Sequence, residues 1–335
     1  IGPLRGPAAG REARSPAYHG IRHRTPCDAP CGPRVPLAPC PPVVRPSGSR
    51  DIERPDVSIH SSDPTSLSSG DQALPDVQGL ADHRRVAIDK AGVSQVRYPI
   101  QLRTPAGGRM PASAVIDMFV SLPADRKGTH MSRFMEVLGD HAHGLDPLNV
   151  RDMCAVLRER LDADDAYVRM AFTYFINKFA PVTQKPGLLD YEVEIDASSH
   201  ASRDDVVLTV AASATSLCPC SKEISAFGAH NQRCRIAASV RFDGELLIED
   251  LAEILESAAS CEVYSVLKRP DEKFVTEEAY KNPKFVEDII RDLATALDRD
   301  ERITWFRITS ENFESIHGHN AYAEIVRDKR AGSTS

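Results

Sequence analysis

No run of 18 or more consecutive apolar residues occurs in the 335-residue sequence, which argues against a membrane-spanning helix. The N-terminal region also lacks the basic segment, apolar segment and small-residue cleavage site of a secretory signal. Cysteine is scarce, because eight cysteines in a chain of this length do not make a disulfide-rich scaffold. We therefore expect a cytoplasmic protein whose cysteines are reduced thiols or metal ligands.

Lysine is absent from residues 1–50, which carry eight arginines and two acidic residues for a net charge of +6. The rest of the chain carries 33 basic and 46 acidic residues, a net charge of −13. An acidic body argues against broad nucleic-acid binding, and no membrane partner is expected either. An anionic substrate would need a locally basic pocket.

Periodic apolar pattern is almost absent from residues 1–85, which hold 14 of the 24 prolines. Such a segment cannot bury enough apolar surface to offset the entropy cost of ordering it. We expect residues 1–85 to be a disordered Pro/Arg-rich extension, or the product of a misassigned gene start. Residues 331–335 are expected to be a short tail.

Residues 86–200 are predicted to form a first module. Alternating and β-branched residues predict four strands, at 93–104, 113–122, 167–179 and 189–197. Between the second and third of these, helical spacing predicts helices at 133–138 and 148–161. The second helix follows Asp146-Pro147, a cap and first-turn signature.

Residues 201–330 repeat this order and are predicted to form a second module. The predicted strands are 206–215, 235–242, 303–309 and 321–326, and the predicted helices are 248–257 and 285–297. Two tandem ββααββ modules indicate an α+β fold, each module having an antiparallel sheet with helices on one face. Closing several modules into a barrel would remove the exposed sheet edges, so we expect a homo-oligomer.

The most informative motif is SLCPCSKE at residues 216–223, followed by GAHNQR at 228–233. One residue separates Cys218 from Cys220, and His230 lies ten residues further on. Thiolate and imidazole together suit a borderline-soft ion such as zinc. On spacing alone, a buried thiol pair or a redox pair stays open, although one intervening residue suits a disulfide poorly.

Five blocks of the sequence together resemble the type IB GTP cyclohydrolase I family. The blocks are KGTHMSRF (127–134), TSLCPCSK (215–222), GAHNQR (228–233), EVYSVLKRPDE (262–272) and NFESIHGH (312–319). They occur in order within residues 75–330, and the first 75 residues have no counterpart. The resemblance implies the tunnelling fold, in which ββααββ modules assemble into barrels, and a homotetramer with active sites between subunits. It also implies conversion of GTP and water to 7,8-dihydroneopterin triphosphate and formate, the first step of tetrahydrofolate biosynthesis.

The resemblance implies a metal site made by Cys218, His230 and Glu272. Alone, His230 is typical of a structural histidine and Glu272 of a solvated loop carboxylate. The three ligands would leave one position of a tetrahedral site for water, and the ion would make hydroxide available near neutral pH. We expect one divalent metal per site (zinc, manganese or iron(II)) and no organic cofactor. Cys220 is expected to support the site or to take part in catalysis.

The resemblance assigns Glu287 to the guanine ring, because a carboxylate accepts hydrogen bonds from both the guanine N1–H and the 2-amino group. Alone, Glu287 is a favourable acid in the first turn of a helix. Glu314, His317 and His319 are implied in proton transfer. On a strand the two histidines would share a face. A polar turn with its bend at Gly318 is the alternative.

Basic residues within the blocks are candidates for binding the triphosphate, although each alone is typical of a surface charge. They are Lys127, Arg133, Lys222, Arg233, Lys268 and Arg269. His130 is expected either near the site or in a packing role. The remaining thiols downstream of residue 85, Cys154, Cys234 and Cys261, lie in apolar patterns and are predicted to be core residues.

Three other functions remain open. An archaeal-type cyclohydrolase would release a cyclic phosphate. A tunnelling-fold nitrile reductase of queuosine synthesis would use a cysteine nucleophile and a nicotinamide without a metal, which leaves His230 and Glu272 unexplained. A non-catalytic module with a structural zinc would use Cys218, Cys220, His230 and Glu272, which leaves Glu314, His317 and His319 without a role.

Overall fold

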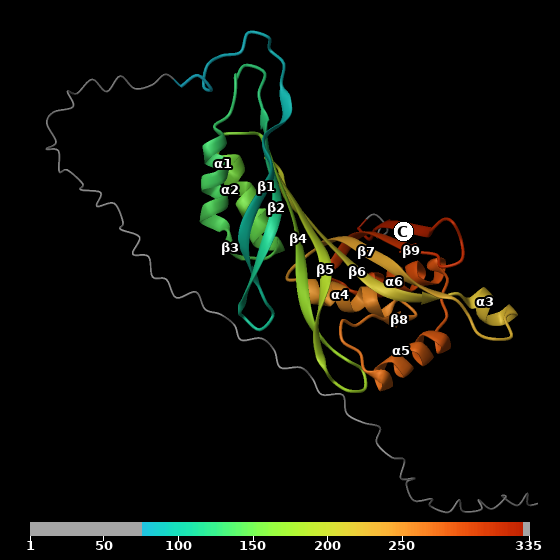
Figure 1. The fold of residues 1–335 in the computed structure, drawn as a ribbon. Coiled ribbons are helices and arrows are strands. Elements are labelled where there is room, and N and C mark those ends of the chain that lie inside the picture. The colour runs from blue at the N-terminus through green and yellow to red at the C-terminus, as the bar shows by residue number, and fades with distance from the viewer. Residues whose placement is uncertain (1–75, 331–335) are drawn as a thin grey trace, which may run out of the picture. The chain divides into compact units, whose positions relative to one another are not determined.

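The computed structural model describes residues 76–330, which form one large sheet with helices packed against it (Figure 1). Most of the predicted extension and the tail at 331–335 lie outside the described residues. The last part of that segment, residues 76–85, forms turns and bends, with an isolated bridge between Ala81 and Arg126. No helix of the described part is long and apolar enough to cross a membrane.

In the first half of this region, every predicted strand and helix overlaps an observed element of the same type. The elements are β1 (Ile88–Arg103), β2 (Arg109–Leu122), α1 (Met131–His141), β3 (His143–Leu145), α2 (Pro147–Arg160), β4 (Asp165–Phe179) and β5 (Pro186–His200). The start of α2 is the predicted one: the Asp146 carboxylate accepts from the Asn149 backbone N–H at 2.8 Å, and Pro147 is the first helical residue.

The second half is richer in helices than predicted. Its elements are β6 (Arg203–Leu217), α3 (Pro219–Ile224), β7 (Asn231–Phe242), α4 (Ile248–Ser257), β8 (Cys261–Glu262), α5 (Arg269–Lys281), α6 (Val286–Arg299), β9 (Ile303–Asn312) and β10 (Ala321–Asp328). The predicted order of six elements for 201–330 omitted α3 and α5. A helix as short as α3 gives no periodic signal, and α5 buries only Asp271 and Ala279, so it has no apolar stripe to detect.

All ten strands belong to one sheet of order β10-β9-β7-β6-β5-β4-β2-β1-β3, with β8 paired to β6. Apart from the parallel contact between β1 and β3, neighbouring strands are antiparallel. Because β5 pairs with β6, the sheet continues across the boundary between the two predicted modules. The fold is thus mixed α+β, dominated by a large antiparallel sheet.

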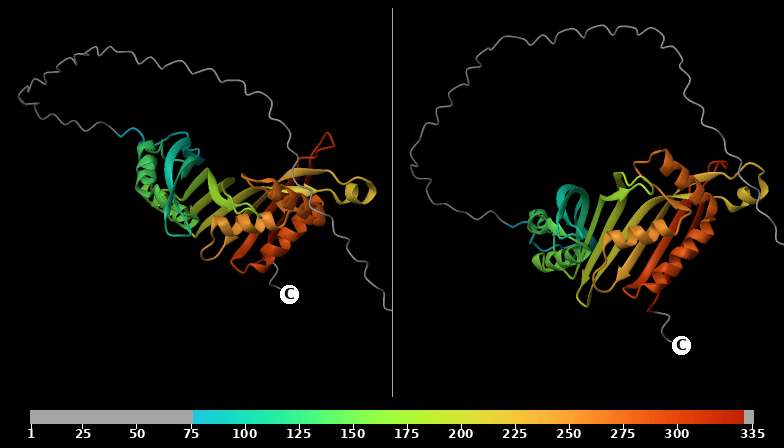
Figure 2. Two further views of the ribbon diagram at one scale, coloured as in Figure 1. Left: turned by 60° about the horizontal axis from the view of Figure 1, so that its bottom comes forward. Right: turned by 90° about the horizontal axis from the view of Figure 1, so that it is seen from below.

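The core lies between this sheet and the helices along one of its faces (Figure 2). Strand residues alternate between buried and more exposed positions, as expected for a sheet covered on one side. The apolar stripe of α6 (Ile289, Ile290, Leu293 and Leu297) is buried. Burial of each of these side chains stabilises the fold by about 1.5–3 kcal/mol. Cys154, Cys234 and Cys261 are buried too, which confirms their prediction as core residues.

Candidate functional site

Three of the motif blocks meet at one end of the sheet. The register pairs Leu217, the last residue of β6, with Asn231, the first residue of β7. It also pairs Cys234 of β7 with Asn312, the last residue of β9. The segments that follow β6, precede β7 and follow β9 therefore lie side by side, at the end of the sheet where α3 projects (Figure 1).

Cys218 and His230 continue the β6–β7 pairing by one step. The Cys218 backbone N–H donates to the His230 carbonyl at 3.1 Å. Residues directly opposite each other on antiparallel strands have Cβ atoms about 5 Å apart on the same face. The half-buried Cys218 and His230 thereby occupy opposite positions on neighbouring segments, with their side chains on the same face.

Ser221 holds this pair in place from the first turn of α3. Its hydroxyl donates to the Cys218 carbonyl at 3.1 Å and accepts from the His230 backbone N–H at 3.2 Å. Its own N–H donates to the Cys218 sulfur at 3.4 Å, so Cys218 caps α3. Cys220, in the same turn, is exposed.

The imidazole of His230 is linked to the segment after β9 by Gln232. The His230 Nδ1 lies 2.9 Å from Oε1 of Gln232 and 3.3 Å from the Ser315 hydroxyl. The Gln232 Nε2 donates to the Glu314 carboxylate at 3.4 Å. The Gln232 amide therefore links the Glu314 carboxylate to the His230 imidazole.

The start of α6 is anchored to the end of β6. The Lys284 backbone N–H donates to the Leu217 carbonyl at 3.0 Å, and the Ser216 hydroxyl donates to the Lys284 carbonyl at 3.2 Å. Glu287 follows three residues later in the first turn of α6, and its side chain is exposed. Glu287, the guanine-binding candidate, is thus separated by one short segment from Lys284, which is bonded to the end of β6 at Leu217.

His317 and His319 lie in the connection between β9 and β10, not on a strand. Strand alternation therefore does not explain why the two side chains lie together. Their rings stack at a centroid distance of 5.3 Å and an interplanar angle of 26°. Both side chains are exposed and lie in the same connection as Glu314.

Glu272 is in the first turn of α5, not in a loop. The opposite end of α5 contacts α3, where Lys222 Nζ donates to the Tyr280 carbonyl at 2.6 Å. Eight residues at 1.5 Å per residue place Glu272 about 12 Å along the helix axis from Tyr280. Within one chain, Glu272 is therefore at the end of α5 remote from α3.

The start of α5 is held by the buried carboxylate of Asp271. It accepts from the Val182 N–H at 2.9 Å, the Thr183 N–H at 2.8 Å, the Thr183 hydroxyl at 2.7 Å and the Lys268 N–H at 2.9 Å. Burial alone would raise the pKa of Asp271, but these hydrogen bonds outweigh it and hold the pKa well below its usual range. Asp271 thus fixes α5 to the β4–β5 connection.

The predicted metal ligands fit an ion in part. Cys218 and His230 supply two neighbouring donors of the right chemistry for zinc or a similar divalent ion. Among residues 76–330 of a single chain, no group of three or more His, Cys, Asp or Glu side chains is close enough to hold an ion. The third ligand, Glu272, therefore stays a prediction.

The candidate cations are divided between the two ends of the sheet. Lys222 lies four residues after Cys218, and Arg233 lies three residues after His230. Lys268 and Arg269 lie at the start of α5. Lys127, His130 and Arg133 follow β2. Because β2, β4, β5 and β6 pair antiparallel in turn, the end of β2 lies at the opposite end of the sheet from the end of β6.

His130 Nε2 lies 3.1 Å from the Asp76 carboxylate, so it has a local partner there.

The family model described as type I GTP cyclohydrolase folE2 matches residues 74–323. The chain belongs to this family. The FolE2 GTP cyclohydrolase of Magnetococcus marinus is 50% identical over 258 residues, which cover 77% of this chain and 97% of that relative. The FolE2 proteins of Nitrosococcus oceani and Paraburkholderia xenovorans are 45% and 48% identical over 259 residues, again covering 77% of this chain and 97% of each relative.

Among solved structures, the uricase of Arthrobacter globiformis is similar over 74% of this chain and 95% of its own, with a TM-score of 0.44 and 10% identity. That similarity is too distant to carry an argument. The family found by the sequence comparison agrees with the resemblance carried by the five blocks.

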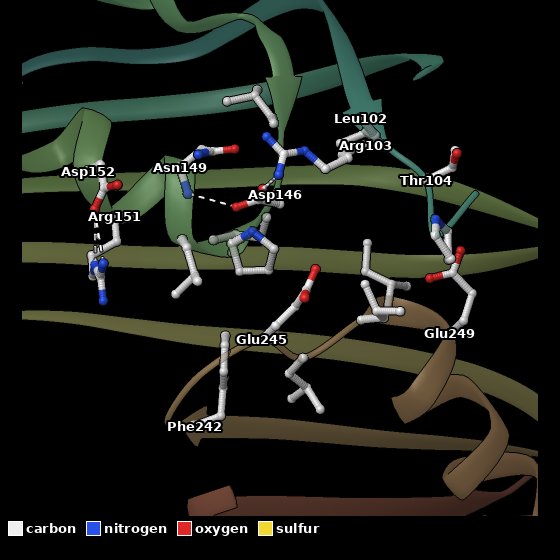
Figure 3. A pocket seen from close by; sticks show the side chains of 18 of the residues that line it. Leu102, Arg103, Thr104, Asp146, Asn149, Arg151, Asp152, Phe242, Glu245 and Glu249 are labelled. Atoms are coloured by element: carbon white, nitrogen blue, oxygen red, sulfur yellow. Dashed lines mark hydrogen bonds and ion pairs between the residues drawn. The ribbon is translucent and has the colours of Figure 1, made fainter. Parts of the chain in front are cut away.

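A cavity of about 720 Å³ in the described part of this chain is lined by none of the predicted site residues. It lies between the starts of α2 and α4 (Figure 3). Its wall carries four carboxylates and two arginines, and Arg103 is paired with Asp146 at 3.4 Å. A wall with excess negative charge repels a triphosphate, so this cavity is a poor candidate for the nucleotide site. An open cavity of about 630 Å³ lies between the α3–β7 connection and α5. Leu217, Ala229 and Asn231, the chain neighbours of Cys218 and His230, line it, but Cys218 and His230 do not.

Three functional candidates in this FolE2 site were not predicted from the sequence: Ser221, Gln232 and Asp271. The signal for Gln232 was present, since it is two residues from His230 at the start of a strand and so shares its face. Asp271 acts through hydrogen bonds to a segment far away in the chain, and Ser221 through bonds to Cys218 and His230, and the sequence contains no pattern for either.

Proposed function

We propose that the protein is a GTP cyclohydrolase that converts GTP and water to 7,8-dihydroneopterin triphosphate and formate, at the start of folate biosynthesis. Family membership across residues 74–323 supports this assignment. The observation that carries it in the structure is the pairing of Cys218 with His230, beside Glu314 and the start of α6. The reductase alternative uses no metal, so it leaves the proposed carboxylate ligand Glu272 unexplained.

We propose that each site takes one divalent ion (zinc, manganese or iron(II)) through Cys218, His230 and Glu272. Thiolate, imidazole and carboxylate are a donor set typical of catalytic zinc. When bound, the ion supplies Lewis acidity that activates water at neutral pH. Cys220 is exposed in the first turn of α3. We propose that it supports the site next to these three ligands and is not itself a metal ligand.

The chain's own residues would bind the purine and move protons. Glu287 is proposed to accept hydrogen bonds from the guanine N1–H and 2-amino group, which selects guanine over adenine. Glu314, His317 and His319 are proposed to take part in proton transfer to and from the purine ring or the ribose as bonds break. The stacked histidines lie in one exposed connection, so they can reach a ligand that enters from solvent.

The site is proposed to be completed by other copies of the chain, in a homotetramer of the tunnelling fold whose modules close into a barrel. Two features support this. Lys127 and Arg133 are at the far end of the sheet from Cys218, so they would reach the triphosphate only from a neighbouring chain. Within residues 76–330, β10 also forms an edge of the sheet with β9 as its one partner strand, and closure into a barrel would cover that edge. Lys222 and Arg233 would add cations from the chain that supplies Cys218 and His230, and Lys268 and Arg269 would accompany Glu272 at the start of α5.

Incubation with GTP and several divalent metals tests the function, with the product identified by mass. We expect a linear triphosphate, dihydroneopterin triphosphate, which becomes fluorescent after oxidation. A cyclic phosphate would indicate the archaeal-type reaction. Consumption of reduced nicotinamide with a nitrile substrate, and no turnover of GTP, would indicate the reductase. Tightly held zinc without either turnover would indicate a structural site.

A further inference from the structure

Gln232 occupies an unusual position between two groups of the proposed site. Its side chain is 8% exposed, so its amide depends on protein partners for hydrogen bonds. One end of the amide faces the His230 Nδ1 at 2.9 Å, and the other faces the Glu314 carboxylate at 3.4 Å. The side chain thus joins the strand that carries a proposed metal ligand to the connection that carries a proposed proton donor.

The orientation of this amide is set by Glu314. A Glu314 carboxylate oxygen accepts a hydrogen bond from the Gln232 Nε2, so the end of Gln232 that faces Glu314 is the NH2 group. The carbonyl oxygen Oε1 must then face His230. The Ser315 hydroxyl, 3.5 Å from the same oxygen, agrees with this orientation because it donates there.

The orientation of the amide in turn fixes the tautomer of His230. A carbonyl oxygen has no proton to give, so the close contact with Nδ1 requires that Nδ1 carry the hydrogen. In a neutral imidazole the other nitrogen, Nε2, then keeps its lone pair. That nitrogen is the one a metal ion would bind, and a hydrogen bond from the opposite ring nitrogen is what orients most metal-bound histidines.

We propose that Gln232 is a positioning residue that fixes the tautomer and ring orientation of His230 for metal binding and, through its NH2 group, holds Glu314 beside the site. The proposal rests on the proposed function and deepens it. Gln232 itself touches neither the ion nor the substrate. It makes the geometry of the metal ligand depend on the placement of Glu314, so the two parts of the site are assembled together.

Two substitutions separate the two halves of this role. Gln232→Leu removes both hydrogen bonds with little change in volume. Gln232→Glu keeps an oxygen acceptor for Nδ1–H but places a second carboxylate against Glu314. Asn320→Ala is the matched control. Asn320 is also an amide that donates to a carboxylate (Glu311, 2.9 Å), on the β9–β10 hairpin that carries Glu314, and it has no contact to His230 in the described structure.

The full-length apoproteins are titrated with zinc in competition with a coloured chelator, and with cobalt(II) to record the thiolate-to-cobalt absorption band. We expect Gln232→Leu to bind zinc 10–100-fold more weakly, with an altered cobalt spectrum. Gln232→Glu should stay within about threefold of wild type in zinc affinity and lose GTP turnover at saturating metal. Asn320→Ala should match wild type in both assays.

Zinc affinity of Gln232→Leu within about threefold of wild type, with an unchanged cobalt spectrum, would overturn the positioning role while leaving the cyclohydrolase assignment intact. A wild-type protein that binds neither zinc nor cobalt would instead overturn the proposed function. Thermal unfolding of each variant distinguishes a positioning role from a merely structural one. A merely structural role would lower the melting temperatures of Gln232→Leu and Gln232→Glu alike and would give the two variants the same zinc affinity.

Discussion

Thr183 donates two hydrogen bonds to the carboxylate of Asp271, one from its backbone N–H at 2.8 Å and one from its hydroxyl at 2.7 Å. This contact joins the connection between β4 and β5 to the first turn of α5. Because Glu272 is the next residue, the same contact also decides where the proposed carboxylate ligand stands. A position 88 residues away in the chain thus shapes the proposed metal site.

Asp271→Asn is expected to lower the melting temperature by several degrees. The amide would turn an NH2 group toward N–H and hydroxyl donors that now share two carboxylate oxygens, and at least one donor would lose its partner. Glu277→Gln is the control, because Glu277 forms only an exposed pair with Lys273 at 3.7 Å on the same helix. Differential scanning calorimetry of both variants measures the effect, and equal melting temperatures would contradict it.

Asp196→Asn is expected to change how stability depends on pH. Burial, followed by the hydrogen bond and negative charge of Glu194, raises the pKa of Asp196 to about 6, against the opposing effect of Arg169 and Lys90. A carboxyl whose pKa is raised in the folded state destabilises the fold increasingly as pH rises from about 4 through about 6. Because of Asp196, the free energy of unfolding of the wild type should fall between acid and neutral pH. The variant should not show this part of the fall.

Urea unfolding at pH 5 and pH 7.5 checks that expectation. The stabilising effect of Asp196→Asn should be larger at pH 7.5, by about 1 kcal/mol. A difference between variant and wild type that is the same at both pH values would show that Asp196 titrates normally in the folded protein.

Glu287→Gln is expected to reduce kcat/KM for GTP by at least about 100-fold, because an amide NH2 group would face a guanine donor. The variant should also lose most of its preference for GTP over ITP, which lacks the 2-amino group. Glu301→Gln is the control, since Glu301 is an exposed glutamate that follows the same helix. Steady-state kinetics with both nucleotides measure the change. Retained preference for GTP in Glu287→Gln would rule out the guanine-binding role.

The cysteines are expected to differ in alkylation by iodoacetamide. Burial raises the pKa of Cys154 and of Cys234 to about 12, so both thiols should stay unmodified in the native protein. The exposed Cys220 should react fastest and the half-buried Cys218 more slowly. Zinc should protect Cys218, and a chelator should restore its reaction. Peptide mapping by mass spectrometry follows each thiol, and labelling of Cys218 that ignores zinc would count against its role as a ligand.

Elements with strong local signals could be predicted from the sequence. The start of α2 follows from Asp146 and Pro147, and α6 follows from apolar residues at helical spacing. By contrast, α5 was missed because its stability comes from Asp271 and the β4–β5 connection, which is distant in sequence. A local pattern predicts a helix only where the helix carries its own apolar face.

The candidate site likewise combines residues that local sequence patterns predicted with residues that they missed. The neighbouring positions of Cys218 and His230 were expected from their blocks, and the pairing of β6 with β7 explains why the two residues meet. The connection containing His317 and His319 was not distinguished from a strand, because a polar segment between two strands fits either. Gln232 was missed since an amide has no chemical signature of its own, and its role is visible only from its two partners.

Formate release from GTP by the metal-reconstituted protein is the most direct test of the central claim, with Cys218→Ala measured beside the wild type. The account predicts one formate for each GTP consumed by the wild type, loss of turnover on chelation and its return on adding metal. It predicts no turnover by Cys218→Ala, with a melting temperature close to that of wild type. Formate release that survives chelation or the loss of Cys218 would contradict the account, as would a Cys218→Ala protein that fails to fold.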